Sequence, residues 1–418
     1  MSSTQQPQEN GRERDFDKLR VADPEHWTDG PPHELFAELR SECPVHWSDG
    51  MSDYPDDTGY WSVTRADDIR AVSLDWKTYS SYVGGVLIST YDWPLEIAQQ
   101  EFIAMDPPRH DRIKNLFQAG FTPRRIAEQE PPVRAIVTDV LKTLEGRETC
   151  DLVADVAQPV VSRVIGKFVG IPIEEDRKWA EMINAALGYE DPDLRGEWTA
   201  EELMNELFTR VGQLVEARQQ EPQDDLLSIL VHAEVEGERL AHEEIVMGFQ
   251  LLMEAGNDST KATFCSGMRA LIEHPDQRQL LLDDPSLISG AVEESLRMYP
   301  AFAHMRRTAT CDTELAGQQI KQGDKVIMWY PSANRQESLY DEPSRFDVRR
   351  NAQHQAFGAG GRHFCLGVAL ARLELRILFE ETLKRYPQME LAGQPVMAQS
   401  TFINQLKTLP VKLGALSA

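Results

Sequence analysis

Apolar residues recur at three- and four-residue spacing over much of the chain, which is the period of an amphipathic helix. Residues 127–146, 201–220 and 366–387 follow this pattern. Residues 243–275 form the longest stretch of this kind, and its middle is apolar nearly all round. A helix that is apolar on every side is buried, so this stretch predicts a helix through the centre of the protein, with the apolar run interrupted at Ala255-Gly256.

Strand signals are fewer and lie in two parts of the chain. Residues 44–50 and 59–65 hold aromatic and β-branched residues, and residues 313–331 combine such residues with turn signals. Residues 1–20 are rich in Gln, Ser, Asn and charge, which is typical of a disordered tail. Because no repeat or linker divides the rest, we expect a single domain over residues 21–418 that is mostly α with small β-sheets.

Composition narrows the classes of protein. The 418 residues contain 43 Lys and Arg against 68 Asp and Glu, a formal net charge of −25, which disfavours binding to nucleic acid or anionic membranes. The five cysteines are odd in number and form no C-x-x-C pair, which argues against a disulfide framework and a cysteine-rich zinc site. The N-terminus is polar and no window approaches about 18 apolar residues, so we expect a cytoplasmic protein that does not enter a membrane.

The segment GAGGRHFCLG, residues 358–367, combines glycines with a cysteine. A phosphate-binding loop is disfavoured, because no apolar strand precedes the segment and G-x-x-x-x-G-K-[ST] is missing. A lone cysteine is more often a small buried hydrophobe. Cys365, however, would lie at the N-terminus of a helix beginning near Leu366, where backbone N–H groups favour a thiolate. A thiolate is a strong axial ligand for haem iron, and glycines would let a flat macrocycle come close.

The segment resembles the haem-binding loop of the cytochrome P-450 family, F-x-x-G-x-H/R-x-C-x-G, through Phe357, Gly361, His363, Cys365 and Gly367, with one extra residue between Phe357 and Cys365. It is similar to bacterial members, several of which act on sterols, methyl-branched lipids or terpenoids. The resemblance implies the cytochrome P-450 fold, a triangular prism of helices. It also implies haem b between a central distal helix and the helix after the loop, with Cys365 as the axial ligand of the iron.

Three further motifs agree with this resemblance, in the order that the family has them. The family pairs E-x-x-R, here Glu294 and Arg297, with an arginine from a P-x-R-F segment, here Arg345. AGNDST resembles the distal motif A-G-x-[DE]-T, which implies catalytic Asp258 and Ser259 with Thr260 as the alternative alcohol, and a groove above the iron at Gly256. MDPPRHDRIKNLFQAGFTP resembles the helix that carries propionate-binding residues in bacterial members.

By this resemblance the haem is bound by residues from these motifs and from HMRRTATCD. The implied cofactor-binding residues are His110, Lys114, Ala255, Gly256, Arg307, Phe357, Gly358, His363, Cys365 and Gly367. Arg306 is the alternative to Arg307 for the propionate. Lys114 stands where the family usually has arginine, which keeps the charge but loses the bidentate fork.

The function implied is that of a haem-thiolate monooxygenase, which inserts one oxygen atom of O₂ into a hydrophobic small molecule of terpenoid, steroid or fatty-acyl type. A chain of this length leaves no room for a reductase domain, so we expect a separate iron–sulfur ferredoxin and its NAD(P)H reductase, and a monomer. The expected basic docking face comprises Arg112, Lys114, Arg124, Arg125 and Arg362. The alternatives are an H₂O₂-dependent peroxygenase and a non-catalytic haem or ligand-binding protein.

Family position also implies which residues contact the substrate. They are Val83, Val86, Leu87, Leu251, Glu254, Ala255, Ala303, His304 and Phe402. Glu254 is unusual, because relatives usually place Val, Leu or Ile there, and a carboxylate in an apolar pocket is costly unless it is protonated, hydrated or paired. Two interpretations stay open: a structural partner for Glu254, or contact with a polar end of the substrate.

Overall fold

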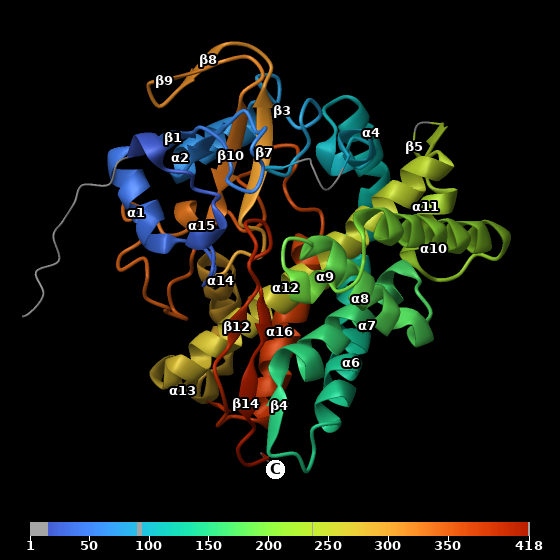
Figure 1. Cartoon of the computed structure of the whole chain (residues 1–418). Coiled ribbons are helices and arrows are strands. Elements are labelled where there is room, and N and C mark those ends of the chain that lie inside the picture. The colour runs from blue at the N-terminus through green and yellow to red at the C-terminus, as the bar shows by residue number, and fades with distance from the viewer. Residues whose placement is uncertain (1–15, 90–93, 236, 417–418) are drawn as a thin grey trace, which may run out of the picture.

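The computed structural model describes residues 16–89, 94–235 and 237–416, which form a mostly helical fold with small sheets (Figure 1). The helices are α1 (His33–Glu42), α2 (Ala66–Leu74), α3 (Leu95–Ala98), α4 (Arg109–Gln118), α5 (Pro123–Glu128), α6 (Glu130–Lys142), α7 (Gln158–Val169), α8 (Asp176–Leu187), α9 (Pro192–Arg195), α10 (Ala200–Gln220), α11 (Leu226–His232), α12 (His242–Glu273), α13 (Pro275–Asp283), α14 (Ile288–Met298), α15 (Tyr330–Ala333) and α16 (Val368–Arg385). Across the described residues, no helix has the length and apolar character needed to cross a membrane.

The largest sheet has five strands in the order β1-β2-β10-β7-β3, and its β2–β10 pair is parallel whereas its other pairs are antiparallel. Its strands are β1 (Val45–Ser48), β2 (Tyr60–Val63), β3 (Tyr79–Ser80), β7 (His304–Ala309) and β10 (Lys325–Trp329). The smaller sheets are formed by β4 (Thr149–Asp151), β11 (Glu390–Leu391) and β14 (Pro410–Lys412), by β12 (Val396–Met397) and β13 (Leu406–Thr408), by β5 (Glu234–Val235) and β6 (Glu238–Arg239), and by β8 (Thr313–Leu315) and β9 (Gln318–Ile320).

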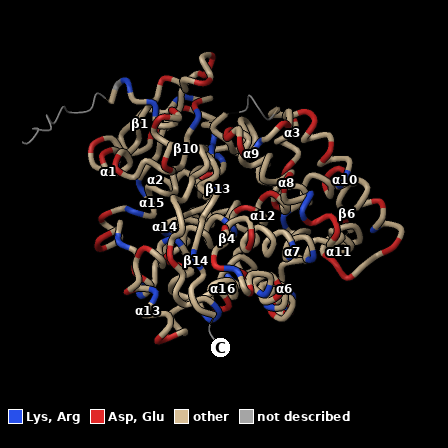
Figure 2. Tube along the Cα trace, turned by 60° about the horizontal axis from the view of Figure 1, so that its bottom comes forward, with Lys and Arg blue, Asp and Glu red and all other residues tan. Residues whose placement is uncertain are grey.

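The start of the fold differs from the expected tail of residues 1–20. Residues 1–15 lie outside the described part of the chain. Phe16–Lys18 form a short 3₁₀ helix, and Leu19 is buried against the cluster that contains Trp27. The fold therefore begins before residue 21. Asp and Glu positions are spread over most of the fold along the Cα trace (Figure 2), in keeping with the net charge.

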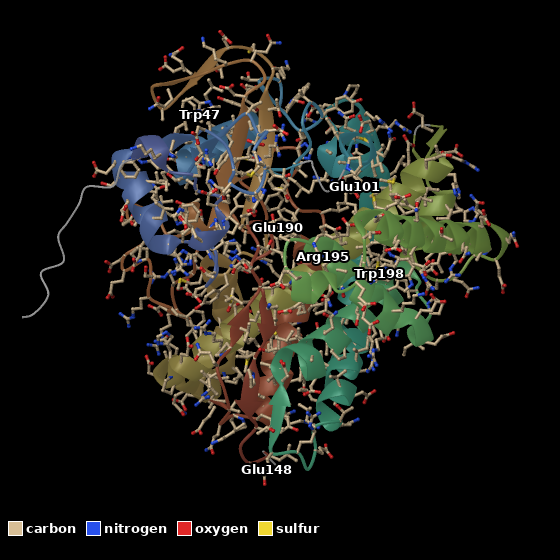
Figure 3. The ribbon with its side chains drawn as sticks, viewed as in Figure 1. Trp47, Glu101, Glu148, Glu190, Arg195 and Trp198 are labelled. Carbon is tan, nitrogen blue, oxygen red and sulfur yellow. The ribbon has the colours of Figure 1, made fainter. Side chains whose placement is uncertain are left out.

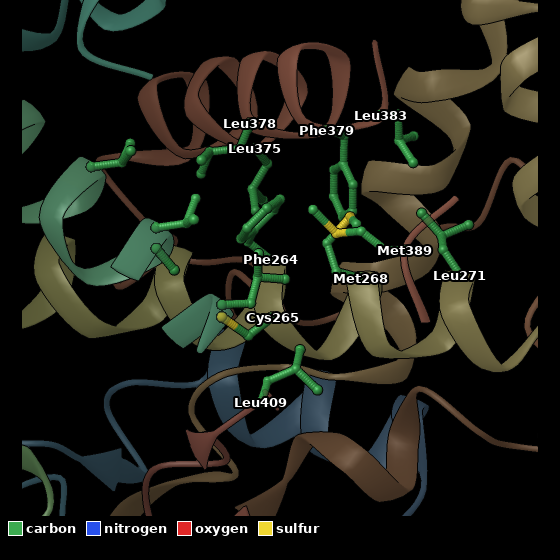
Figure 4. Close-up of a cluster of buried hydrophobic side chains, with 14 of the residues drawn as sticks. Phe264, Cys265, Met268, Leu271, Leu375, Leu378, Phe379, Leu383, Met389 and Leu409 are labelled. Carbon is green, nitrogen blue, oxygen red and sulfur yellow. The ribbon is translucent and has the colours of Figure 1, made fainter. Parts of the chain in front are cut away.

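Helix α12 runs through the interior of the fold, and it is continuous through Ala255-Gly256. Its C-terminal half packs Phe264 and Met268 against Phe379 of α16 in the largest buried cluster (Figure 4). Its glycines allow close contacts with other helices. A Cβ on Gly256 would come within 2.8 Å of Ile165 on α7. The helical prediction for residues 243–275 is thus confirmed, and the small residue at Gly256 serves helix packing as well as the site.

A buried ion cluster joins α14 to the segment after α15. Glu294 and Arg297 form a bidentate pair at 2.7 and 2.8 Å, and both side chains are fully buried. The third member is Arg350, whose Nε donates to Glu294 at 3.1 Å. The assignment of Arg345 to this cluster is wrong: its side chain is exposed and pairs with Glu342, and only its carbonyl oxygen accepts from Arg297.

Replacing each of these two arginines separates the two assignments. Arg350→Ala should lower the free energy of unfolding by about 2–4 kcal/mol, because it removes one partner of a buried carboxylate and several bonds to loop carbonyls. Arg345→Ala is the matched control and should leave stability unchanged, since its ion pair is exposed to solvent. Chemical denaturation measures both, and a larger loss for Arg345→Ala would return that residue to the cluster.

Candidate active site

Two adjoining cavities lie along the face of α12 that carries Ala255. The inner cavity reaches from Ala255, Gly256, Ser259 and Thr260 to the loop around Cys365. The outer cavity extends from Glu254 towards β7 and the segment 85–89. The two share the lining residues Ile103, Leu251, Ala255, Phe302 and Met305, so they adjoin one another.

The loop before Cys365 is held by its own backbone and by α2. The Cys365 N–H donates to the carbonyl of Phe357 at 3.0 Å, and Ser73 Oγ donates to the carbonyl of Gly360 at 2.8 Å. Gly358, Gly360 and Gly361 have φ between +79° and +93°, a region that favours glycine. A Cβ on Gly361 would come within 2.8 Å of the Ser73 carbonyl oxygen. Some of these glycines therefore serve the turn and its contact with α2 rather than clearance for a macrocycle.

Cys365 is the cysteine that lines the inner cavity, as expected. Helix α16 begins at Val368 with Gly367 as its N-cap, slightly later than the sequence indicated. Burial raises the pKa of the Cys365 thiol. The Gly367 N–H and the charges of Lys114 and Arg372 act in the opposite direction, because they stabilise the thiolate. The neighbouring Phe357 ring lies 5.1 Å from the Arg372 guanidinium, which is itself bound at 2.7 Å by both oxygens of Glu293.

One edge of the inner cavity is basic. The rings of His110 and His363 lie 4.3 Å apart, and burial lowers the pKa of both. Arg307 is 3% exposed and donates to the Arg306 carbonyl, yet no carboxylate of the described residues forms a hydrogen bond with it. A buried guanidinium without a carboxylate partner is costly unless an anion binds it.

Lys114 is placed differently from the expectation that it binds a propionate. Its Nζ donates to the carbonyl oxygens of Arg362 and Phe364, the latter at 2.8 Å. Lys114 lines the inner cavity, but in this arrangement its ammonium braces the cysteine loop. Haem fits the remaining groups: a thiol on one side, and Arg307 with two histidines at the edge where propionates would lie.

On the distal side, Ser259 Oγ donates to the carbonyl of Ala255 at 2.7 Å, and both Ser259 and Thr260 line the inner cavity. Asp258 does not line it. Its carboxylate is completely buried on another face of α12, where Oδ1 accepts from Lys261 Nζ at 3.0 Å and Oδ2 has no partner. Lys261 also donates to Gln158 on α7 and Asn184 on α8. Asp258 therefore lies in a buried polar network beside the cavity.

The outer cavity contains most of the residues assigned to the substrate. Those that line it are Val86, Leu87, Leu251, Glu254, Ala255, His304 and Phe402. The assignment of Val83 and Ala303 to the substrate site is wrong, since neither residue lines either cavity. Val83 is 49% exposed, and the next residue, Gly84, lies so close to Arg306 and Thr308 that a Cβ there would collide with them. Ala303 is fully buried in the cluster around Trp329, while its neighbour Phe302 faces both cavities.

His304 has no free polar atom for a ligand. Its Nδ1 lies 2.9 Å from the Thr401 carbonyl, and its Nε2 accepts from the Ile88 N–H at 3.1 Å. Nδ1 must therefore carry the proton, and burial lowers the pKa of His304 to about 4. The ring fixes the segment 86–88 against the loop around Thr401, so its role is to shape the cavity wall.

Glu101 was not identified from the sequence. It stands beside the 3₁₀ helix Phe102–Ala104, lines the outer cavity together with Glu254, and is 7% exposed. In Figure 3 it lies near α4, with Glu190 nearer the centre of the view. No periodic pattern marks Glu101, because only the tertiary fold brings it to α12. Met305 was also missed, although it adjoins His304, which was assigned.

A family model described as Cytochrome P450 matches residues 282–412. The chain is 38% identical over 364 residues to a methyl-branched lipid omega-hydroxylase of Mycobacterium tuberculosis, covering 84% of each protein. It is 32% identical over 397 residues to a steroid C26-monooxygenase of Rhodococcus jostii, covering 93% of this chain and 83% of that protein. The solved structure of Mycobacterium marinum cytochrome P450 CYP268A2 in complex with pseudoionone matches with a TM-score of 0.89 at 36% identity, covering 96% of this chain and 99% of that one. The chain therefore belongs to the cytochrome P450 family and is a monooxygenase whose haem iron takes a cysteine ligand.

Proposed function

We propose that Cys365 is the ligand of the haem iron and that the two adjoining cavities hold a hydrophobic small molecule for oxidation. The observation that carries this proposal is the position of the two cavities: they share apolar lining residues, and together they extend from Glu254 to Cys365. The haem, when bound, supplies the iron at which O₂ is activated. Arg307, His110 and His363 would hold its propionates.

The protein's own residues would deliver protons and exclude water. Ser259 Oγ, bonded to Ala255, is the hydroxyl nearest in sequence to Asp258 that faces the inner cavity. Asp258 holds a proton-accepting oxygen, Oδ2, that has no partner, while Lys261 fixes the other oxygen. We assign Asp258 as the internal proton donor that acts through water, with Ser259 orienting that water and Thr260 as the alternative alcohol.

The substrate class is supported by the lining and by the relatives. The residues shared by the two cavities are aliphatic, aromatic or Met, and they suit a hydrocarbon body. The similar proteins are named for methyl-branched lipids and steroids, and the similar structure holds pseudoionone. We therefore assign an apolar substrate of lipid, steroid or terpenoid type.

Electrons would come from a separate ferredoxin and its reductase. Around the outer side of the Cys365 loop, Arg124 is 89% exposed, Arg362 is 52% exposed and Phe364 is 41% exposed. Four of the five expected docking residues have partners among the described residues: Arg112 pairs with Glu238 and Glu244, Arg124 with Glu128 and Arg362 with Asp111, and Lys114 binds loop carbonyls. Arg124 and Arg362 nonetheless keep more than half of their side-chain surface exposed. We assign the docking face to Arg124, Arg362 and Phe364, where an acidic ferredoxin finds positive charge on an otherwise acidic protein.

Replacing the ligand tests the cysteine assignment. In the reduced, CO-bound protein we expect the red-shifted Soret band of thiolate ligation, and Cys365→His should abolish it, since imidazole donates less electron density than thiolate. Cys265→Ala is the control, because Cys265 is buried in the core away from the cavity, and its band should stay. An unchanged band in Cys365→His would contradict the assignment.

Replacing Asp258 tests the proton donor. Asp258→Asn should slow turnover about 10- to 100-fold while haem binding and substrate affinity hold, because the amide keeps the shape but gives no proton. A stability cycle shows whether the pair interacts: Lys261→Met should destabilise the fold by about 3 kcal/mol, and adding Asp258→Asn should recover part of this. Turnover of Asp258→Asn at the wild-type rate would exclude this role.

The function itself is tested by turnover of lipid, steroid and terpenoid candidates with NADH, ferredoxin and reductase, compared with H₂O₂ alone. We expect product in the first arm, and Ser259→Ala should divert electrons to peroxide because the water loses its anchor. Thr260→Ala is the matched control for a hydroxyl at the same cavity, and it should stay coupled. Turnover with H₂O₂ alone would favour the peroxygenase, and ligand binding without product in either arm would favour a binding protein.

A further inference from the structure

The outer cavity contains two buried carboxyl groups from different elements. Glu254 comes from α12, and Glu101 precedes the helix Phe102–Ala104. They are near enough that burial and the Glu254 charge together raise the pKa of Glu101 well above its usual value, while burial raises the pKa of Glu254 to about 7. Glu101 is more than nine-tenths buried, and its Oε1 has no hydrogen-bond partner among the residues that the structure describes.

The surroundings of this pair do not neutralise it. Gln250 Nε2 donates to Glu254 Oε1 at 3.0 Å, and this is an uncharged donor. A third carboxyl, Glu190, stands on the same lining. No Lys or Arg is among the described residues that line the outer cavity, and the His304 ring is neutral with both nitrogens engaged. The cavity therefore has acceptors and negative charge, but no cation.

Other acids of the chain show what a structural partner looks like. Glu294 is held by two arginines. Glu190 accepts from both the backbone N–H of Thr401, at 2.8 Å, and its hydroxyl, at 3.1 Å. Among the described residues Glu101 has neither kind of partner, although a buried carboxyl group without one is costly. A cationic ligand in the cavity would compensate the charge of the pair.

We propose that Glu101 and Glu254 form a binding site for a cationic nitrogen carried by an otherwise apolar substrate. The proposal rests on the function proposed above, namely that the outer cavity holds the substrate. A cationic nitrogen carries the charge that the pair lacks, and a quaternary nitrogen supplies this charge without an N–H group. The apolar body would lie along Ile103, Leu251 and Phe302, which lead into the inner cavity. Oxidation would then occur at a carbon remote from the nitrogen.

The test compares ligands of one chain length on the haem-loaded protein by titration calorimetry: decyltrimethylammonium, 1-decanol and decanoate. The quaternary nitrogen has no lone pair, so it cannot bind the haem iron. We expect the cation to bind about 10- to 100-fold more tightly than the alcohol, and decanoate to bind most weakly. Glu101→Gln and Glu254→Gln should each remove most of this preference while decanol affinity changes less than about threefold.

Glu190→Gln is the matched control, because it removes a carboxylate from the same lining that Thr401 already occupies, and it should keep the preference. Equal affinity for cation and alcohol in the wild type would overturn the proposal. Tight decanol binding that both glutamine variants lose would also overturn it, in favour of a hydroxyl ligand. The CO-bound spectrum of each protein is recorded alongside: a normal spectrum without charge preference refutes this proposal alone, whereas an abnormal wild-type spectrum refutes the proposed function.

A pH profile of the wild type gives a second measurement that needs no variant. The charge of decyltrimethylammonium does not titrate, so its affinity should rise about tenfold or more between pH 6 and pH 8.5 as Glu254 loses its proton. The other titratable groups on this lining are Tyr54, Glu101, Tyr189, Glu190 and His304. Glu101, whose pKa burial and Glu254 also raise, acts in the same direction when it loses its proton, whereas His304, whose pKa burial lowers to about 4, is already neutral in this range. A flat profile would overturn the proposal.

Discussion

The fold depends on finding hydrogen-bond partners for the polar side chains in the middle of the mostly apolar helix α12. Helix α12 is 32 residues long, and most of its side chains are buried. Every polar group at that depth must find a partner on α12 or on a neighbouring helix, since an unsatisfied one costs about 1–3 kcal/mol. The neighbours come close because α12 has glycines where they cross it: Gly248 against Phe117 of α4, and Gly256 against Ile165 of α7.

Each polar residue in the middle of α12 meets this constraint in its own way. Ser259 returns its hydroxyl to the carbonyl one turn earlier, and Asp258 pairs with Lys261 one turn later. Lys261 in turn reaches the amide oxygens of Gln158 and Asn184, so α7 and α8 are tied to the same network. Glu254 has only the amide of Gln250. Several polar groups of the helix thus find a partner on the faces that touch protein, whereas Gln250 Oε1, Asn257 Oδ1 and Asp258 Oδ2 are buried without one among the described residues. Glu254 faces the outer cavity, which is the space that a ligand would fill.

How far the sequence predicts this arrangement depends on the kind of signal. Periodicity found α12 and α16, and β-branched or aromatic runs found β1, β2 and β10. Neither pattern indicated β7. Its polar residues His304, Arg306 and Arg307 are all buried, so the sequence of this strand does not alternate between apolar and polar residues. The family motifs assigned Cys365, His363 and Arg307 to one site, and all three line the inner cavity.

The remaining differences between the sequence-based predictions and the structure arise where the role of a residue depends on the direction of its side chain. Arg345 and Arg350 lie in one short segment, and nothing in their order says that Arg350 turns inward. Lys114 was expected at a propionate, but its flexible stem reaches the loop carbonyls instead. Glu101 could not be found at all, because its importance comes from a contact with a helix about 150 residues later in the chain.

The inner cavity holds the Arg307 guanidinium beside His110 and His363, whose pKa burial lowers, and one buried carboxyl group, Glu374. The carboxyls of Glu101, Glu190 and Glu254 lie on the outer cavity, which has no Lys or Arg among its described lining residues. Haem carries two propionates, so its binding would balance Arg307 and leave the outer cavity with carboxyl groups that no cation balances. Low-dielectric walls strengthen the field of these groups. A substrate with one polar end would therefore be oriented by the protein before it reaches the iron, with its apolar end directed inward, and selection by charge would be exerted in the outer cavity rather than beside Cys365.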